Sequence, residues 1–477
     1  MRRIALLIIV FRLAVFRLAV FCLAVFCLAG LAAAPHGQAA AAGAAAPRLQ
    51  IPVTRFTLPN GLRVILHEDH TVPLLTVNVW YHVGSAREKP GRTGFAHLFE
   101  HLMFEGSGHV KEGQFDLLLE AAGATNNGST ENDRTNYYID APSNALDLAL
   151  FLESDRMGFL LDAMSPARVN GQRDVVKNER RQSYENAPYG MASIAIGELL
   201  YPQGHPYRWP TIGYTEDLTA ASYEDVVEFF KQYYQPANAS LVVAGDIDSA
   251  RARAAIEKWF ADVKPGDGVI PPIDSPHPAL TEVKRKTIRD RVQLPRLYLD
   301  WITPAHFAPG DAELDVLSVL LAGGKNSRLY KRLVYELQIA QDVYAVQQSM
   351  SLNSQYEIAV TARPASGGGA PAATIDRIRA IVDEEIRKLQ QAPPEPREFE
   401  RALNQIESSF YNRLERVGGF GGVGDQLNAY DFATGNPDYF NEDLSRYRAL
   451  APGDVQAAAA RFLPLDKRVE LIVEPAK

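Results

Sequence analysis

The chain has 477 residues, of which 47% are hydrophobic and 22% charged, the balance of an ordinary globular protein. This length allows two to four domains, each with a core of its own. The net charge of −8, without any long basic run, argues against nucleic acid as the main partner.

The first 46 residues differ in kind from the rest. They begin with positive charge, continue as an apolar run and end in small residues. Because Arg12 and Arg17 interrupt the run, we interpret residues 18–34 as the apolar part of a signal peptide, with cleavage within 32–46. The alternative is an uncleaved membrane anchor, although the uninterrupted part is short for a membrane span.

Both cysteines of the chain, Cys22 and Cys27, lie inside this segment. The mature chain would therefore contain no disulfide and would depend on core burial for its stability. We expect an exported protein in a bacterial-type periplasm, with the membrane involved only through the signal or anchor segment.

Hydrophobic periodicity and turn signals predict a first α+β unit in residues 47–261. Ser222 and Asp225 form a capping-box pattern at the start of one of its helices. In chain order we expect a hairpin around a Pro-Asn-Gly turn in 55–66, a strand in 74–83, a helix at 95–103, a strand in 135–140, helices within 143–161 and 166–186, a helix from 222 and a strand from 239.

Residues 262–288 are rich in proline and glycine and are interpreted as a linker. A second unit in residues 289–477 then repeats the pattern of the first. Its expected elements are strands at 296–301 and 355–362 and helices around 311–322, 325–338, 373–390 and 395–415.

The ends of the two units match in sequence. Glu-Asp-Leu at 216–218 recurs at 442–444, and Asp-Val at 225–226 recurs at 454–455, with a nearly constant offset. This predicts a duplicated α+β unit, in which mixed or antiparallel sheets pack against helices. The alternative is coincidence between two ordinary α+β domains.

One helical segment carries an unusual polar group. The sequence GFAHLFEHLMFEG at residues 94–106 is apolar except for few ionisable side chains, among them His97, Glu100 and His101. The two histidines are four residues apart and project from one helix face, so both imidazoles can reach one cation. Glu100 lies next to that face and can address a zinc-bound water, whose pKa the metal lowers toward about 7. The alternative is a set of partnered polar groups on a half-buried helix, although an apolar helix buries three such groups only with compensation.

A catalytic zinc needs a third protein ligand, and Glu179 is the candidate. It shares one side of its predicted helix with Val175 and Val176, where a carboxylate requires a partner. The alternative partner is an arginine such as Arg180 or Arg181.

The HLFEH motif at 97–101, together with the downstream VKNERR at 176–181, resembles the inverzincin metallopeptidases of the pitrilysin/insulinase family, in particular its shorter members of the processing-peptidase type. The resemblance covers essentially residues 50–475. It implies one Zn²⁺ per chain held by His97, His101 and Glu179, with Glu100 as general base. It also implies two homologous halves that form a clam-like chamber, of which only the first binds metal.

The resemblance extends to a peptide-binding strand. Asn127, Gly128 and Thr130 match the family's edge-strand motif, which holds extended peptide by strand addition, with Gly128 in place of the usual alanine. The alternative for Asn-Gly is a simple turn. A second glutamate that the family often has seven residues before the ligand glutamate is replaced here by Gln172.

The second half departs more sharply from the family. Family members commonly have an arginine and a tyrosine seven residues apart after Ser-Arg-Leu, and this chain has Val334 and Gln341 there. Tyr335 and Tyr344 are nearby but not at that spacing. We therefore expect a homologous partner subunit without zinc ligands that supplies the Arg–Tyr pair.

The leading hypothesis is an exported zinc metalloendopeptidase that hydrolyses peptides or unfolded segments. The competing hypothesis is a non-catalytic structural or assembly subunit that retains the fold. A zinc- or peptide-binding carrier without turnover is a third alternative.

Overall fold

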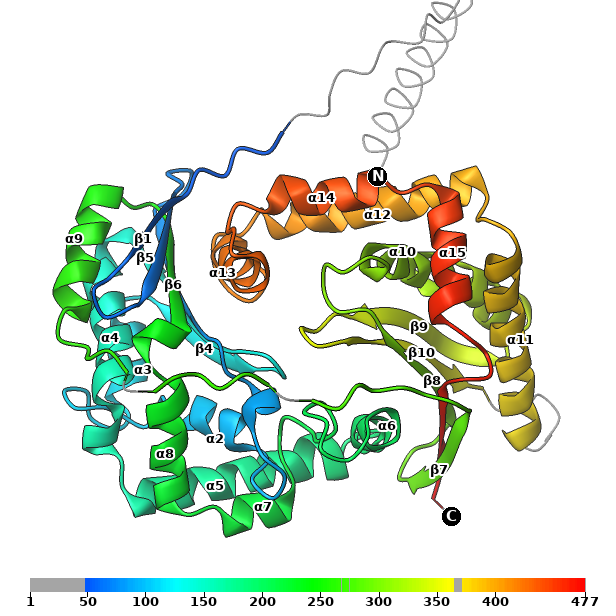
Figure 1. Ribbon diagram of the computed structural model, residues 1–477, viewed down its shortest axis with the longest axis horizontal. Coiled ribbons are helices and arrows are strands. Elements are labelled where there is room, and N and C mark those ends of the chain that lie inside the picture. Colours follow the sequence, from blue (N-terminus) through cyan, green and yellow to red (C-terminus); the bar gives the residue numbers. More distant parts are fainter. Residues whose placement is uncertain (1–47, 267, 274, 364–370, 477) are drawn as a thin grey trace, which may run out of the picture. The chain divides into compact units, whose positions relative to one another are not determined.

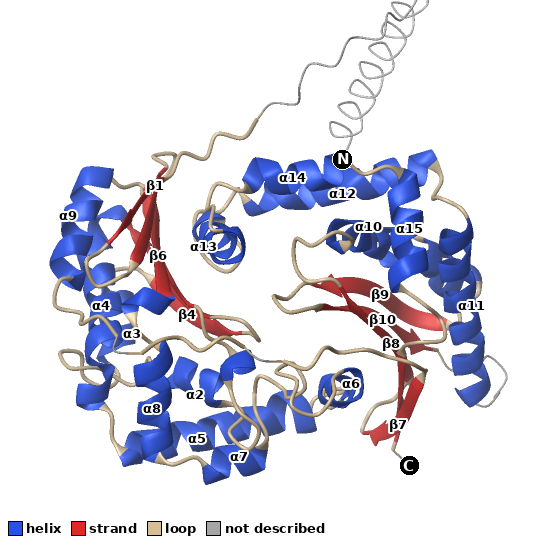
Figure 2. Ribbon diagram, viewed as in Figure 1, coloured by secondary structure: helices blue, strands red, loops and turns tan. Residues whose placement is uncertain are grey.

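The computed structural model describes residues 48–476 except 267, 274 and 364–370. The predicted signal peptide therefore lies outside the described residues. Within the described part of the chain, no helix is long and apolar enough to cross a membrane. Two β-sheets, each with helices packed against it, form the frame of this part (Figures 1 and 2).

The first sheet has six strands in the order β1-β2-β6-β3-β5-β4. The predicted hairpin is confirmed, because β1 and β2 pair antiparallel around the Pro-Asn-Gly turn. β6 pairs parallel with β2 and antiparallel with β3, and β4 is an edge strand. The strands are β1 Thr54–Thr57, β2 Arg63–Glu68, β3 Leu74–Tyr81, β4 Thr125–Thr130, β5 Thr135–Pro142 and β6 Ala239–Gly245.

The second sheet has five strands in the order β7-β11-β8-β10-β9. β11 pairs parallel with β7 and antiparallel with β8, and β10 pairs antiparallel with both β8 and β9. The strands are β7 Lys284–Asp290, β8 Arg296–Thr303, β9 Ala340–Gln348, β10 Ser354–Ala362 and β11 Val469–Pro475.

The two sheets repeat one topology. β2, β6, β3, β5 and β4 correspond in order and pairing sense to β7, β11, β8, β10 and β9. The matching sequence segments also occupy matching helices. Glu-Asp-Leu lies in α7 Thr215–Ala220 and again in α14 Phe440–Arg448, and Asp-Val lies in α8 Tyr223–Tyr233 and again in α15 Pro452–Phe462. The predicted duplicated α+β architecture is confirmed.

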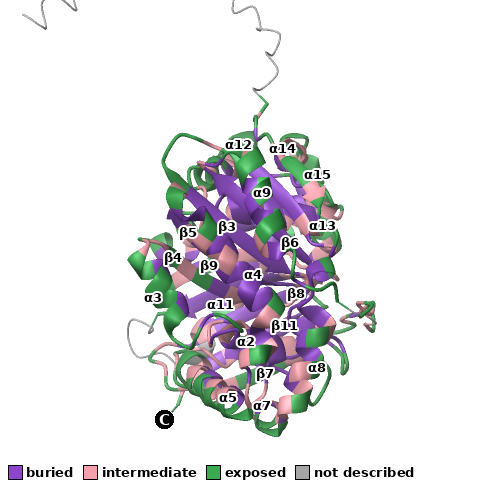
Figure 3. Ribbon diagram, turned by 90° about the vertical axis from the view of Figure 1, so that its left-hand side faces the viewer, coloured by how far each residue is buried: buried purple, intermediate pink, exposed green. Residues whose placement is uncertain are grey.

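Helices cover the sheets and supply most of the two large cores. Apolar residues of α2, α4, α8 and α9 pack with β2, β3 and β5 into one core, and those of α10, α11 and α15 pack with β8 and β10 into another. Strands β3 and β6 are almost wholly buried (Figure 3). The α-helices are α2 Phe95–Leu102, α3 Gln114–Ala121, α4 Leu146–Ala163, α5 Pro166–Arg180, α6 Ala192–Leu200, α7 Thr215–Ala220, α8 Tyr223–Tyr233, α9 Ser249–Phe260, α10 Asp311–Ala322, α11 Pro371–Gln391, α12 Pro396–Arg413, α13 Val423–Thr434, α14 Phe440–Arg448 and α15 Pro452–Phe462.

Short helical turns complete the described elements: the 3₁₀ turns η1 Ser85–Arg87, η2 Ser143–Ala145 and η4 Pro236–Asn238, and the π-helical turns η3 Arg181–Glu185 and η5 Tyr330–Glu336. The predicted capping box of Ser222 and Asp225 at the start of α8 is confirmed.

Some sequence-based boundaries were wrong. The end of the predicted linker is part of β7, which finds its partner only in the last strand of the chain. The helix expected at 325–338 is replaced in its second part by η5, after which the chain enters β9. Helix α6 lies in the first half of the sequence, yet it packs against β8 and β11 of the second sheet.

A buried carboxylate fastens α13 to the first sheet. Asp425 Oδ1 accepts hydrogen bonds from Trp80 Nε1 at 2.9 Å, Asn136 Nδ2 at 3.0 Å and Asn78 Nδ2 at 3.4 Å. Asn428, one turn later, donates to the backbone and side-chain oxygens of Asn78. These bonds connect a helix of the second half of the sequence to strands β3 and β5.

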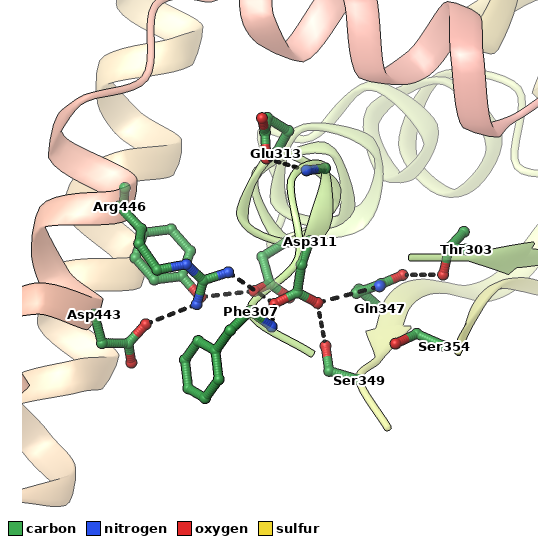
Figure 4. A network of polar contacts seen from close by, with 12 residues as sticks. Thr303, Phe307, Asp311, Glu313, Gln347, Ser349, Ser354, Asp443 and Arg446 are labelled. Atoms are coloured by element: carbon green, nitrogen blue, oxygen red, sulfur yellow. Dashed lines mark hydrogen bonds and ion pairs between the residues drawn. The ribbon is translucent and has the colours of Figure 1, made fainter. Parts of the chain in front are cut away.

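A second buried carboxylate organises the second half (Figure 4). Asp311, at the start of α10, accepts hydrogen bonds from Ser349 Oγ and from the backbone N–H of Phe307, and it forms an ion pair with Arg446 of α14. Arg446 also pairs with Asp443. Since each of these buried charges has a partner, the network joins α10, α14 and the end of β9 without leaving a charge uncompensated.

We expect Asp425→Ala to lower the free energy of unfolding by about 1–3 kcal/mol, because it leaves buried donors of Trp80 and Asn136 without an acceptor. Chemical denaturation of the purified protein would measure this. The control is Glu400→Ala, which truncates an exposed acid on α12 and should change the free energy of unfolding by less than about 0.5 kcal/mol. Equal, small effects of both substitutions would contradict the anchoring role of Asp425.

Candidate metal centre

Helix α2 presents one apolar face to the core and one polar face to the site. Phe95, Leu98 and Phe99 are buried. Phe99 stacks on Phe229 of α8, with ring centroids 5.3 Å apart. The opposite face carries His97, whose ring lies 4.8 Å from that of His101.

The N-terminus of α2 is held by a side chain from outside the helix. Gly94 occupies the N-cap position with φ of 89° and has no side chain to cap the helix. Instead, the buried carboxylate of Glu88 accepts hydrogen bonds from the backbone N–H groups of Gly94 at 2.9 Å and Ala96 at 2.8 Å. These are groups that the first turn of a helix leaves without partners. No motif or spacing in the sequence predicts this role of Glu88.

The third predicted ligand reaches the two histidines from α5. This helix begins where the sequence indicates, with Ser165 as N-cap and Pro166 in the first turn. Near its end, Glu179 Oε2 lies 3.2 Å from His101 Nε2 and 3.7 Å from His97 Nε2. The predicted ligand set thus converges on one point.

The arginines considered as alternative partners of Glu179 bind elsewhere. Arg180 donates to the carbonyl of Gly213 at 2.6 Å and forms an ion pair with Glu185. Arg181 donates to Asn178. The carboxylate of Glu179 is therefore left to the two imidazoles.

The donor set and its dimensions fit a zinc ion. Among the described residues, His97, His101 and Glu179 form the one group of three or more potential ligands, with ligand atoms within 4.8 Å of one another. Tetrahedral zinc with bonds of about 2.0–2.1 Å holds neighbouring ligand atoms about 3.3 Å apart. Two imidazole nitrogens and one carboxylate oxygen match a catalytic zinc site with a coordination position left open.

The electrostatics of the site differ among the three predicted ligands. Burial lowers the pKa of His97 to about 4, which keeps its imidazole neutral. For His101, burial acts to lower the pKa, but the hydrogen bond with Glu179 and the nearby carboxylates raise it overall. That same hydrogen bond lowers the pKa of Glu179 and keeps it ionised.

Glu100 lies beside the ligands and is oriented by strand β4. Thr130 Oγ1 donates to Glu100 Oε2 at 2.6 Å. Burial raises the pKa of Glu100, with the hydrogen bond from Thr130 opposing the shift. Gly128 approaches the same side chain so closely that a Cβ atom on it would lie 3.1 Å from Glu100 Cγ. The predicted strand residues Gly128 and Thr130 therefore face the candidate metal centre.

Asn127 lies on the other face of β4. It is opposite Tyr138 in the register with β5, and its own Oδ1 accepts a hydrogen bond from the backbone N–H of Gly128 at 2.9 Å. The segment is a strand, so the alternative of a simple Asn-Gly turn is wrong. Among the described residues, β4 pairs only with β5. Its other edge is therefore free to pair with a further strand.

Gln172 occupies the position where the family often has glutamate. Its side chain lies near His101 and acts to raise the pKa of that imidazole, and its Nε2 donates to Glu105 Oε1 at 2.6 Å. A polar amide thus lies beside a predicted metal ligand, where carboxylates and carbonyls lie in many zinc sites. The position of Gln172, seven residues before Glu179, was evident from the sequence. Its proximity to His101 was not.

The second-half residues of the predicted departure lie in η5 and β9. Val334 is buried in the second core, and Tyr335 is 73% exposed. Tyr344 donates to Glu357 Oε1 at 2.6 Å. Gln341 is exposed.

Comparison with known proteins identifies the family to which the chain belongs. A family model described as insulinase (peptidase family M16) matches residues 63–193, and one described as the peptidase M16 inactive domain matches residues 220–406. The zinc protease PqqE of Helicobacter pylori is 30% identical over 366 residues, which cover 75% of this chain and 79% of that protein. The chain belongs to the insulinase family.

Solved structures share this fold. The crystal structure of a protease from Helicobacter pylori matches with a TM-score of 0.82 and 26% identity, covering 89% of this chain and all of that one. The periplasmic protease PqqL from Escherichia coli matches with a TM-score of 0.72 and 18% identity, covering 89% of this chain and 48% of that chain. At 18% identity, the similarity to PqqL shows a shared fold and no more.

We expect Gln172→Ala to weaken zinc binding about 10- to 100-fold, because His101 loses the polar neighbour beside its ring. Competition with a chromophoric chelator would measure the affinity. Asn170→Ala, an exposed change on the same helix, is the matched control and should leave the affinity unchanged. An equal affinity of the Gln172→Ala and parent proteins would contradict this positioning role.

Proposed function

We propose that this chain is an exported zinc metalloendopeptidase of the shorter, processing-peptidase-like type, acting on peptides or unfolded segments. The observation that carries the proposal is the convergence of His97, His101 and Glu179 beside the half-buried carboxylate of Glu100. Membership in a family whose relatives are named zinc proteases supports it. Export is supported by the signal-like sequence of residues 1–46.

Zinc at this site would supply Lewis-acid chemistry, polarising the scissile carbonyl and lowering the pKa of water toward about 7. Glu100 then acts as general base: its carboxylate takes a proton from the attacking water and later gives it to the leaving amine. Thr130 holds Glu100 Oε2 and leaves Oε1 for this transfer. The raised pKa of Glu100 brings its proton affinity nearer to the one such a shuttle needs.

Substrate would bind by strand addition to the open edge of β4. Main-chain hydrogen bonds to an edge strand recognise any extended peptide, so this mode suits unfolded segments better than folded proteins. The side-chain oxygen of Asn127 accepts a hydrogen bond from the N–H of Gly128. When a peptide binds, Asn127 would give up this bond, and the N–H of Gly128 would donate to the peptide instead. Gly128 and Thr130 would set the distance between the peptide and Glu100.

Glu100→Gln tests the chemistry. We expect the variant to bind zinc as the parent does and to lose peptidase activity by a factor of about 10²–10⁴, because the amide cannot accept the proton. Metal analysis and cleavage of an unstructured fluorogenic peptide would measure both. The control, Glu120→Gln, changes an exposed glutamate on α3 and should retain full activity. A zinc-loaded parent as inert as the variant would support the alternative of a structural or assembly subunit.

A homologous subunit would complete the site. The second half has Val334 and Gln341 where the family resemblance implies an arginine and a tyrosine that bind substrate. We expect the purified chain alone to cleave peptides slowly, and a homologous chain without zinc ligands but with the Arg–Tyr pair to raise kcat/KM. Steady-state kinetics with and without that chain would measure the effect. Full activity of the chain alone would rule out the need for a partner.

A further inference from the structure

One large apolar side chain near β4 has no role in the site described above. Phe420 is 38% exposed and lies in the segment RVGGFGGVG, residues 416–424, which joins α12 to α13. We call this segment the glycine loop. A phenylalanine that is partly exposed on a loop contributes little to folding. The contacts of Phe420 can therefore indicate another role.

The glycine loop sits on the first sheet, where no larger residue would fit. A Cβ atom on Gly418 would lie 1.9 Å from Asp140 Oδ1 of β5, and one on Gly424 would lie 2.6 Å from Thr76 Cγ2 of β3. The loop backbone therefore touches these strands directly. At Gly418 and Gly424, glycine is required for this close approach.

Hydrogen bonds also hold the glycine loop in place. The backbone N–H of Gly421 donates to Asp425 Oδ2 at 2.8 Å, while the other oxygen of Asp425 binds the sheet through Trp80 and Asn136. Backbone bonds from Val423 to Arg416 and from Gly424 to Val417 close the loop on itself. Phe420 is thus presented by an ordered loop, with little conformational entropy left to lose on binding.

The ring of Phe420 contacts Tyr138 of β5, the strand that pairs with β4. The two rings are edge to face, with centroids 5.0 Å apart. Tyr138 is the cross-strand partner of Asn127, on the face of the sheet opposite to Glu100. A peptide added to β4 would direct alternate side chains to the two faces, so every second one would lie on the face of Tyr138 and Phe420.

We propose that Phe420 and Tyr138 form an apolar subsite that receives one large apolar side chain of the bound peptide, on the face opposite the metal centre. The inference rests on the proposed function and names the substrate class: extended peptides with a phenylalanine, leucine or similar residue next to the residues that face the metal. A peptide paired with β4 is separated from Tyr138 of β5 by the width of β4. A peptide side chain must therefore be long to reach the rings of Tyr138 and Phe420. Alanine at the same position does not reach it.

Peptide binding, rather than turnover, is the direct test. In the Glu100→Gln background, anisotropy of two labelled peptides that differ only by phenylalanine or alanine at one position, scanned along the sequence, gives the preference at each position. We expect one position at which phenylalanine binds about tenfold more tightly. Phe420→Ala should abolish that preference, and Phe420→Leu should restore part of it. The control Val269→Ala truncates another exposed apolar side chain and should leave the preference intact.

The outcomes separate this inference from the proposed function. Loss of the preference in Phe420→Ala, with zinc content and thermal stability unchanged, supports the subsite even if the parent protein proves catalytically inert. A preference that survives Phe420→Ala overturns the inference, whatever the activity. An equal loss of affinity for both peptides also overturns it, and a change of oligomeric state in Phe420→Ala would instead assign the ring to an interface between chains.

Discussion

The hydrogen bonds between the buried carboxylate of Glu88 and the first turn of α2 fix the helix on which the whole site depends. Burial raises the pKa of Glu88 to about 8, while the bonds from the backbone N–H groups of Gly94 and Ala96 oppose that shift. A polar group that is costly to bury is retained here at the point where the helix cannot cap itself. The orientation of His97, Glu100 and His101 follows from the direction in which the helix begins, and the ring stack of Phe99 on α8 fixes its rotation.

The local part of the site could be predicted from the sequence, because it follows from helix periodicity. His97 and His101 are neighbours on any α-helix, and Glu179 shares a face with Val176 on another. The contacts that tune these groups could not be predicted in this way. Thr130 reaches Glu100, and Gln172 reaches His101, across distances in sequence that only tertiary packing brings together.

The same division holds for the fold. The duplication was recognisable because matching helix caps and apolar strands recur in order, and the sheets indeed repeat one topology. Strands β4 and β9 were harder to see: β4 has the sequence TNNGST, with no apolar alternation, because one face serves the site and one edge is open. β7 lies in a polar stretch that becomes a strand only through its partner β11. The apolar helix α6 gave no sign in its sequence that it would pack on the second sheet.

The two halves contribute different things to the site. The difference can be seen in the roles of their polar groups. In the first half, the buried carboxylate of Glu88 holds the start of α2, and the half-buried carboxylate of Glu100 lies beside the predicted metal ligands. In the second half, Asp311 and Asp425 are satisfied by partners that join helices to each other or to the opposite sheet. Within its described residues the second half has no cluster of potential metal ligands, and α13 with the glycine loop is the element that brings this half to β5, next to the strand on which a peptide would lie.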